Sequence, residues 1–138
     1  VLLVASSPSI AGRTGARPWR ATVALDTAAF DLTAIMAERH PGFFDQAFGA
    51  DPAYWRQASP LLQLNGPLAA PLLAVCSSQR RDPCAQAWAF ADRAASLGGA
   101  SVNVLPVDLS HGQINTLLGT PSSYTADVQA YMESLGLP

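Results

Sequence analysis

The stretch PLLAVC, residues 71–76, is apolar at every position. A short run without polar alternation predicts a strand that is covered on both faces, as in a parallel sheet. Two further runs are strand-like: ATVAL at residues 21–25, which ends at Asp26, and SVNVLPVD at residues 101–108. Because Pro106 has no backbone N–H, the last of these strands is expected at an edge of the sheet.

Helical signals separate and follow these strands, which is the pattern of an α/β protein. Asp82 followed by Pro83 predicts a helix start with Asp82 as the N-cap, and the pair Gly98-Gly99 predicts the end of that helix. Its apolar face is expected at Trp88, Ala91 and Ala95. A final helix, with Ser123 as N-cap, is predicted by one apolar stripe at Tyr124, Val128, Tyr131, Met132 and Leu135.

The remaining segments are less regular. Residues 1–7 are expected to be the end of a buried helix, and residues 8–18 a loop. Residues 31–64 carry three prolines and predict several short helices. This region is rich in aromatic residues, namely Phe43, Phe44, Phe48, Tyr54 and Trp55.

Composition excludes two classes of function. The 138 residues have a formal net charge of −2, and their basic residues are dispersed arginines rather than the concentrated stripe of a nucleic-acid binder. No apolar stretch approaches the roughly 20 residues that cross a bilayer. Neither a nucleic-acid partner nor a membrane partner is therefore expected. Charged residues make up only 13% of the chain, about half of the roughly 25% found in average domains, so part of the surface is expected to be covered.

The two cysteines, Cys76 and Cys84, lie eight positions apart and match neither a redox nor a zinc motif. They could form a disulfide, for which chain entropy predicts a stabilisation of about 2.5 kcal/mol, or remain free thiols. A disulfide would favour a secreted or periplasmic protein, and free thiols a cytoplasmic one.

Three segments in a fixed order carry a resemblance to a known family. They are YWRQASP at residues 54–60, PLLAVC followed by Asp82 and Gln86-Ala87, and DLSHGQIN at residues 108–115. Together they resemble the C-terminal half of the α/β-hydrolase fold, in the carboxylesterase and acetyl-xylan or feruloyl esterase-like branch. The resemblance implies that residues 1–138 form part of a three-layer sandwich with mostly parallel strands and a helical cap-like insertion at about residues 31–64.

The family's catalytic triad follows the chain order serine, acid, histidine, with the serine in a G-x-S-x-G turn. No such motif occurs in this sequence, so the serine and the oxyanion hole are expected in a missing N-terminal half. The resemblance assigns His111 as the general base and Asp82 as the acid. The family usually places the acid about two residues earlier, where this chain has Arg80, and Asp108 is the rival. His40 is expected to have no catalytic role.

The resemblance implies a serine hydrolase of carboxylic esters that acts through an acyl-enzyme, without a metal or an organic cofactor. Its expected partners are a small-molecule ester and the missing half of the domain, and the chain alone should be inactive. The aromatic cluster of residues 43–55 is expected to line an acyl or aryl pocket. The alternative is a non-catalytic α/β module that binds a ligand or partner. Such a module should fold alone as a monomer, whereas half of an esterase would expose a bare strand edge at residues 21–25.

Overall fold

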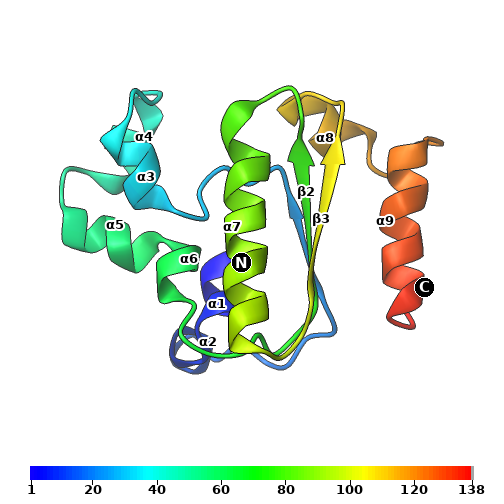
Figure 1. Cartoon of the computed structure of the whole chain (residues 1–138), viewed down its shortest axis with the longest axis horizontal. Helices are drawn as coiled ribbons and strands as arrows, with labels where there is room; N and C mark the ends of the chain where they lie inside the picture. Colours follow the sequence, from blue (N-terminus) through cyan, green and yellow to red (C-terminus); the bar gives the residue numbers. More distant parts are fainter. Residues whose placement is uncertain (138) are drawn as a thin grey trace.

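The computed structural model describes residues 1–137, and its centre is a sheet of three parallel strands (Figure 1). The strands are β1 (Thr22–Leu25), β2 (Leu72–Ser77) and β3 (Val102–Val107), in the order β1-β2-β3. Thr22 pairs with Leu72, and Leu72 pairs in turn with Val102. All three strands predicted from the sequence are confirmed, and so is the α/β class.

Helices pack on both faces of the sheet (Figure 1). Alternate side chains of β2 explain this arrangement, because Leu72 and Ala74 lie in one core while Leu73 and Val75 lie in the other. The first core also contains residues of α1 (Leu2–Ser6) and α7 (Arg81–Leu97). The second is closed by α8 (His111–Leu117) and α9 (Ser123–Ser134). The continuous apolar run of β2 is thus buried on both sides, as its composition predicts.

Four short helices form the insertion between β1 and β2: α3 (Leu32–Ala37), α4 (Phe43–Phe48), α5 (Pro52–Ala58) and α6 (Pro60–Gln63). Asp31 begins α3 by accepting hydrogen bonds from the amides of Thr33 and Ala34. The buried Ser59 hydroxyl accepts from the Leu32 amide and donates to the Trp55 carbonyl, which ties α3 to the end of α5. The short helices expected in this region are confirmed.

Two helix predictions were wrong. Residues 8–18 are not all loop, because α2 (Pro8–Arg13) begins there with the Ser7 side chain as its cap. Helix α7 begins at Arg81, so Asp82 is not its N-cap but lies in its first turn.

The buried face of α7 was also predicted incorrectly. Trp88 is 50% exposed, and the helix instead buries Ala87, Phe90 and Ala94, each one position before an expected residue, together with Pro83. Phe90 packs on Phe30, with 5.0 Å between the ring centroids. The sequence places Phe30 outside any strong helical pattern, so this partner could not be foreseen.

The C-terminal elements follow the prediction closely. Helix α9 buries Tyr124, Val128 and Tyr131, which confirms the predicted stripe, although its N-cap is Ser122 rather than Ser123. Helix α8, whose first residue is His111, is not predicted by the sequence analysis. It begins there because Ser110 and Gln113 form a capping box.

The two edges of the sheet differ. The amides of Thr22 and Asp26 bond to β2, so the intervening backbone groups of Val23 and Leu25 face away from it, and no partner pairs with them within residues 1–137. On the other edge, the carbonyls of Ser101 and Val107 bond to β2, so Pro106 faces outward. The prediction that Pro106 belongs to an edge strand is confirmed.

A disulfide joins Cys76, at the end of β2, to Cys84 in the first turns of α7. It closes the turn that connects this strand to this helix. In the described part of the chain, no helix is both long enough and apolar enough to cross a membrane.

Candidate functional site

Asp26 directly follows β1 at the carboxyl edge of the sheet, where parallel strands usually present functional groups. Its amide still bonds to the Val75 carbonyl, but its φ of 53° lies in the left-handed region. Among residues 1–137 no other non-glycine residue has a positive φ. Aspartate tolerates this conformation better than most residues, and the turn directs its side chain into the protein, where the residue is only 2% exposed.

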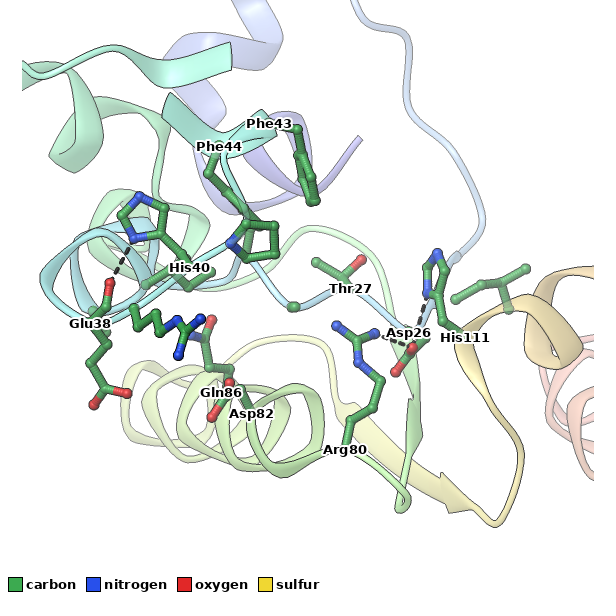
Figure 2. A pocket seen from close by; sticks show the side chains of 17 residues that line it. Asp26, Thr27, Glu38, His40, Phe43, Phe44, Arg80, Asp82, Gln86 and His111 are labelled. Carbon is green, nitrogen blue, oxygen red and sulfur yellow. Dashed lines mark hydrogen bonds and ion pairs between the residues drawn. The ribbon is translucent and has the colours of Figure 1, made fainter. Parts of the chain in front are cut away.

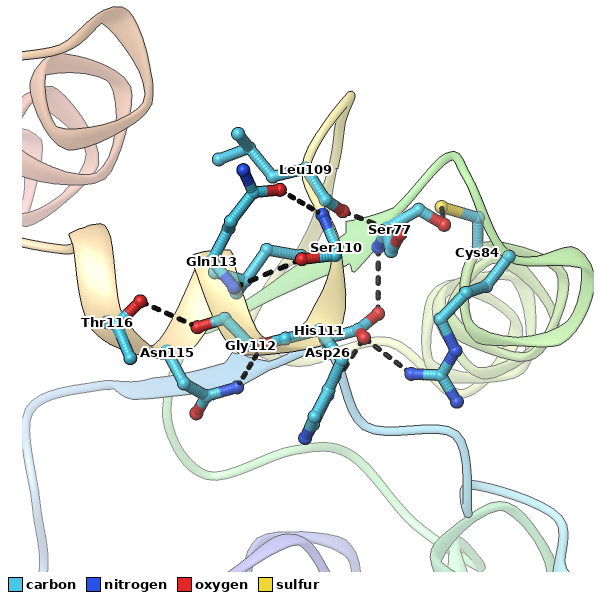
Figure 3. Close-up of polar contacts among 12 residues, drawn as sticks. Asp26, Ser77, Cys84, Leu109, Ser110, His111, Gly112, Gln113, Asn115 and Thr116 are labelled. Carbon is cyan, nitrogen blue, oxygen red and sulfur yellow. Dashed lines mark hydrogen bonds and ion pairs between the residues drawn. The ribbon is translucent and has the colours of Figure 1, made fainter.

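Three groups from different segments surround the Asp26 carboxylate (Figure 3). Its Oδ1 accepts a hydrogen bond of 2.8 Å from the amide of Ser77 at the end of β2. Its Oδ2 lies 2.9 Å from Nδ1 of His111 and also accepts a hydrogen bond from Nη1 of Arg80. A buried carboxylate requires such partners, because removing its charge from water without them is costly.

His111 is the first residue of α8, and its side chain is 60% exposed. With Asp26 ionised, Nδ1 is the donor of their hydrogen bond, so the neutral ring would carry its free electron pair on Nε2. Nε2 has no hydrogen-bond partner within residues 1–137. The Ser77 hydroxyl donates to the Leu109 carbonyl at 2.7 Å, which fastens the loop before His111 to the end of β2. The arrangement is a histidine oriented by a carboxylate, with its second nitrogen available to accept a proton.

The acid expected from the sequence does not make this contact. Asp82 and His111 line the same cavity, but no hydrogen bond joins them among the described residues. Because α7 begins at Arg81, Asp82 projects from a helical turn instead of a loop. Asp108, the rival, accepts a hydrogen bond from Gln79 Nε2. The residue that sequence reasoning missed is Asp26, although an acidic residue ending the first predicted strand was a usable signal.

Asp26 and His111 lie at one end of a cavity of about 680 Å³ (Figure 2). This volume is within the range of small-molecule sites, roughly 300–1,000 Å³. The apolar part of its wall is formed by Leu25, Ala28, Ala29, Ala34, Ile35, Pro41, Phe43 and Phe44. The charged side chains in its wall include both acidic and basic groups, so the wall does not strongly favour either an anion or a cation.

His40 lies at the end of this cavity away from Asp26 (Figure 2). Its Nε2 is 3.0 Å from Asp45 Oδ1, and its Nδ1 is 2.7 Å from the Glu38 carbonyl. The Asp45 hydrogen bond, and after it the Glu38 carbonyl, raise the pKa of His40 above its ordinary value. Both nitrogens face acceptors, so the protonated ring satisfies both bonds. This leaves neither nitrogen to act as a base.

The aromatic residues of the insertion fall into two groups. Phe43 and Phe44 line the cavity beside Asp26, stacked with 4.4 Å between their ring centroids. Phe48 and Tyr54 line a second groove, of about 590 Å³, that runs along β1. Trp55 uses its indole N–H to bind the Gly49 carbonyl.

A carboxylate–histidine pair at the wall of a cavity can support proton transfer to and from a bound molecule. Within residues 1–137, no three His, Cys, Asp or Glu side chains are grouped as ligands of a metal would be. No protein-family model, curated protein or solved structure matches this chain.

Proposed function

We propose that this chain belongs to a serine hydrolase of carboxylic esters, in which His111 is the general base and Asp26 is the acid that orients it. The observation that carries the proposal is the hydrogen bond between the buried Asp26 carboxylate and Nδ1 of His111 at the carboxyl edge of a parallel sheet. This places a carboxylate and an imidazole in the relation that activates a serine hydroxyl. Asp26 thereby replaces Asp82 in our assignment of the acid.

The reaction would proceed in two halves. His111 Nε2 takes the proton of a serine hydroxyl while the serine oxygen bonds to the ester carbonyl carbon, and the same proton then passes to the departing alkoxide. Water deprotonated by His111 attacks the resulting acyl-enzyme, and the proton returns to the serine oxygen as the carboxylic acid leaves. During both halves the negative Asp26 stabilises the imidazolium.

The serine in this proposal is not one of the 138 residues, because the sequence contains no G-x-S-x-G motif. We assign the nucleophile and the oxyanion hole to a segment that would add to the sheet beside β1, whose outer edge is unpaired within the described residues. The substrate would occupy the cavity next to Asp26, with an apolar acyl or alcohol group against Phe43 and Phe44. The disulfide between Cys76 and Cys84 favours an oxidising compartment, so we propose a secreted or periplasmic enzyme.

The test compares three matched acid variants, Asp26→Asn, Asp82→Asn and Asp108→Asn, in a protein that joins this chain to the segment that we propose supplies the serine. Hydrolysis of p-nitrophenyl acetate should fall in Asp26→Asn by a factor on the order of 10⁴, because the wrong tautomer of His111 is then favoured. The other two variants should retain activity within a few-fold. His111→Ala should be as inactive as Asp26→Asn or more so.

Two results would contradict the proposal. If the loss occurred in Asp82→Asn and not in Asp26→Asn, the acid would be the residue that the sequence indicated. The 138-residue chain alone should hydrolyse the ester no faster than buffer, because removal of a catalytic serine costs on the order of 10⁶ in turnover. Hydrolysis by this chain that disappears in His111→Ala would show that the nucleophile is not where we place it.

A further inference from the structure

Ser77, the last residue of β2, makes one hydrogen bond toward each member of the pair formed by Asp26 and His111 (Figure 3). Its amide donates to Asp26 Oδ1 at 2.8 Å, and its hydroxyl donates at 2.7 Å to the carbonyl of Leu109, two residues before His111. Ser77 is fully buried, and shielding from water strengthens such bonds. One residue therefore links the segment that carries the carboxylate to the segment that carries the imidazole.

We infer that the Ser77 hydroxyl is a positioning group that holds His111 within hydrogen-bonding distance of Asp26. The importance of this role for catalysis rests on the proposed function, whereas its effect on the position of His111 does not. Ser77 does not line the cavity beside Asp26, so it would act through His111 and not on the substrate.

The Leu109 carbonyl has no hydrogen-bond partner within residues 1–137 besides the Ser77 hydroxyl. A partly buried carbonyl that loses its partner is destabilised, and it should move toward water or toward another donor. Because Leu109 lies two residues before His111, this movement would shift the start of α8. The 2.9 Å hydrogen bond between His111 Nδ1 and Asp26 Oδ2 would then be lost, since hydrogen bonds weaken with distance and misalignment.

The rest of α8 is anchored independently of Ser77. Ile114 is fully buried, and its carbonyl accepts a hydrogen bond of 3.0 Å from the Tyr124 hydroxyl. Ser110 and Gln113 cap the helix by bonding to each other. Removal of the Ser77 hydroxyl should therefore release the residues just before α8 and leave the body of the helix in place.

The neighbouring Ser78 supplies a matched control, since its hydroxyl also donates to a backbone carbonyl. This bond, of 3.1 Å to the Val107 carbonyl, is exposed, and the same carbonyl already accepts from the Ser78 amide at 2.9 Å. Loss of the Ser78 hydroxyl therefore leaves its carbonyl paired, whereas loss of the Ser77 hydroxyl leaves the Leu109 carbonyl unpaired.

The test compares Ser77→Ala with Ser78→Ala in the 138-residue chain by NMR of the nitrogen nuclei of the His111 ring. When the ring is neutral, its two tautomers differ in which nitrogen carries the proton. The Nδ1–H form should predominate in the unaltered chain and in Ser78→Ala, because the Asp26 carboxylate selects it. It should lose this predominance in Ser77→Ala, because the ring moves away from Asp26. A merely structural role would lower stability without changing the tautomer.

An unchanged tautomer in Ser77→Ala would overturn the inference, as would an equal change in Ser78→Ala. If Ser77→Ala does not fold, Ser77→Thr and Ser77→Val replace it, because these side chains have nearly the same shape and only threonine has the hydroxyl. The Nδ1–H form should then predominate in Ser77→Thr alone. If no variant that lacks the hydroxyl folds, the role of the hydroxyl lies in the stability of the chain, and the inference is wrong.

In the active protein, Ser77→Ala should lower kcat by roughly 10- to 100-fold and leave KM nearly unchanged. The reason is that it misplaces the base without altering the wall of the cavity. Ser78→Ala should retain both constants. Failure of the proposed function would be recognised separately, because Asp26→Asn would then retain activity whichever tautomer His111 adopts.

Discussion

The left-handed backbone of Asp26 is the local feature on which the candidate site depends. Strain of this kind often accompanies functional residues, because the surrounding structure must hold them in place. Here the Val75 carbonyl holds the Asp26 amide, and the Ser77 amide holds the carboxylate. The sequence predicts that β1 ends at Asp26, but the backbone turn depends on contacts with β2, which lies about 50 residues later in the chain.

His40 gives a separate prediction at the scale of one residue. Its hydrogen bond to Asp45 raises its pKa, so Asp45→Asn should lower the pH at which His40 titrates. Since the folded-state pKa is the higher one, the pair stabilises the fold fully below the unfolded-state pKa and loses this contribution as the pH rises through the folded-state value. NMR titration of His40 checks the shift. Asp51→Asn, which changes the cap of α5 instead, should leave the His40 titration unchanged.

At the scale of elements, the disulfide fixes the connection between β2 and α7. Its removal should lower the free energy of unfolding by about 2.5 kcal/mol, because the closed loop is short. Urea denaturation with and without a reductant measures this difference. The Cys76→Ala/Cys84→Ala double variant is the control, and its stability should not depend on the reductant. Equal stability of the unaltered chain in both conditions would contradict the prediction.

The same connection shows why the central strand could be predicted from the sequence and the start of α7, with the position of Asp82, could not. PLLAVC is apolar throughout, so burial on both faces defines it as a central strand without reference to the rest of the chain. The start of α7 has no comparable local signal, because Asp82-Pro83 fits an N-cap pair although the helix begins at Arg81. A difference of one or two residues at this boundary moves Asp82 from the end of a loop into a helical turn. Boundaries of this kind are uncertain by one or two residues when they are read from the local sequence alone.

The general location of the site was nevertheless predictable. His111 follows the strand predicted at residues 101–108, and parallel strands bring their carboxyl ends to one edge of the sheet. The structure confirms that His111 lies at this edge, beside the end of β1. Which carboxylate meets it is decided by the strand order β1-β2-β3 and by the turn at Asp26. Neither can be read from the spacing of residues.

At the scale of the whole molecule, the exposed edge of β1 distinguishes the esterase half from a self-sufficient module. An unpaired parallel strand is a template for another strand, so the isolated chain should associate as its concentration rises. Val23→Pro should reduce this association, because it removes an amide that faces away from β2. Analytical ultracentrifugation measures the effect.

The matched control for this experiment is Ala24→Pro, which removes an amide on the side of β2 and should destabilise the fold instead. Its loss of stability can be measured by thermal unfolding. If the unaltered chain is a stable monomer at every concentration, the alternative of a self-contained binding module is favoured over the esterase half.

The outward-facing Pro106 makes the two margins of the molecule chemically unequal. The edge formed by β3 lacks one backbone N–H that a neighbouring strand would bond to, because Pro106 has none. The edge formed by β1 has the N–H and C=O groups of both Val23 and Leu25. A further strand should therefore pair more readily with β1 than with β3. A strand that pairs with the outer edge of β1 would lie next to Asp26, which directly follows β1, so it would also bring new side chains towards the cavity that Asp26 and His111 line.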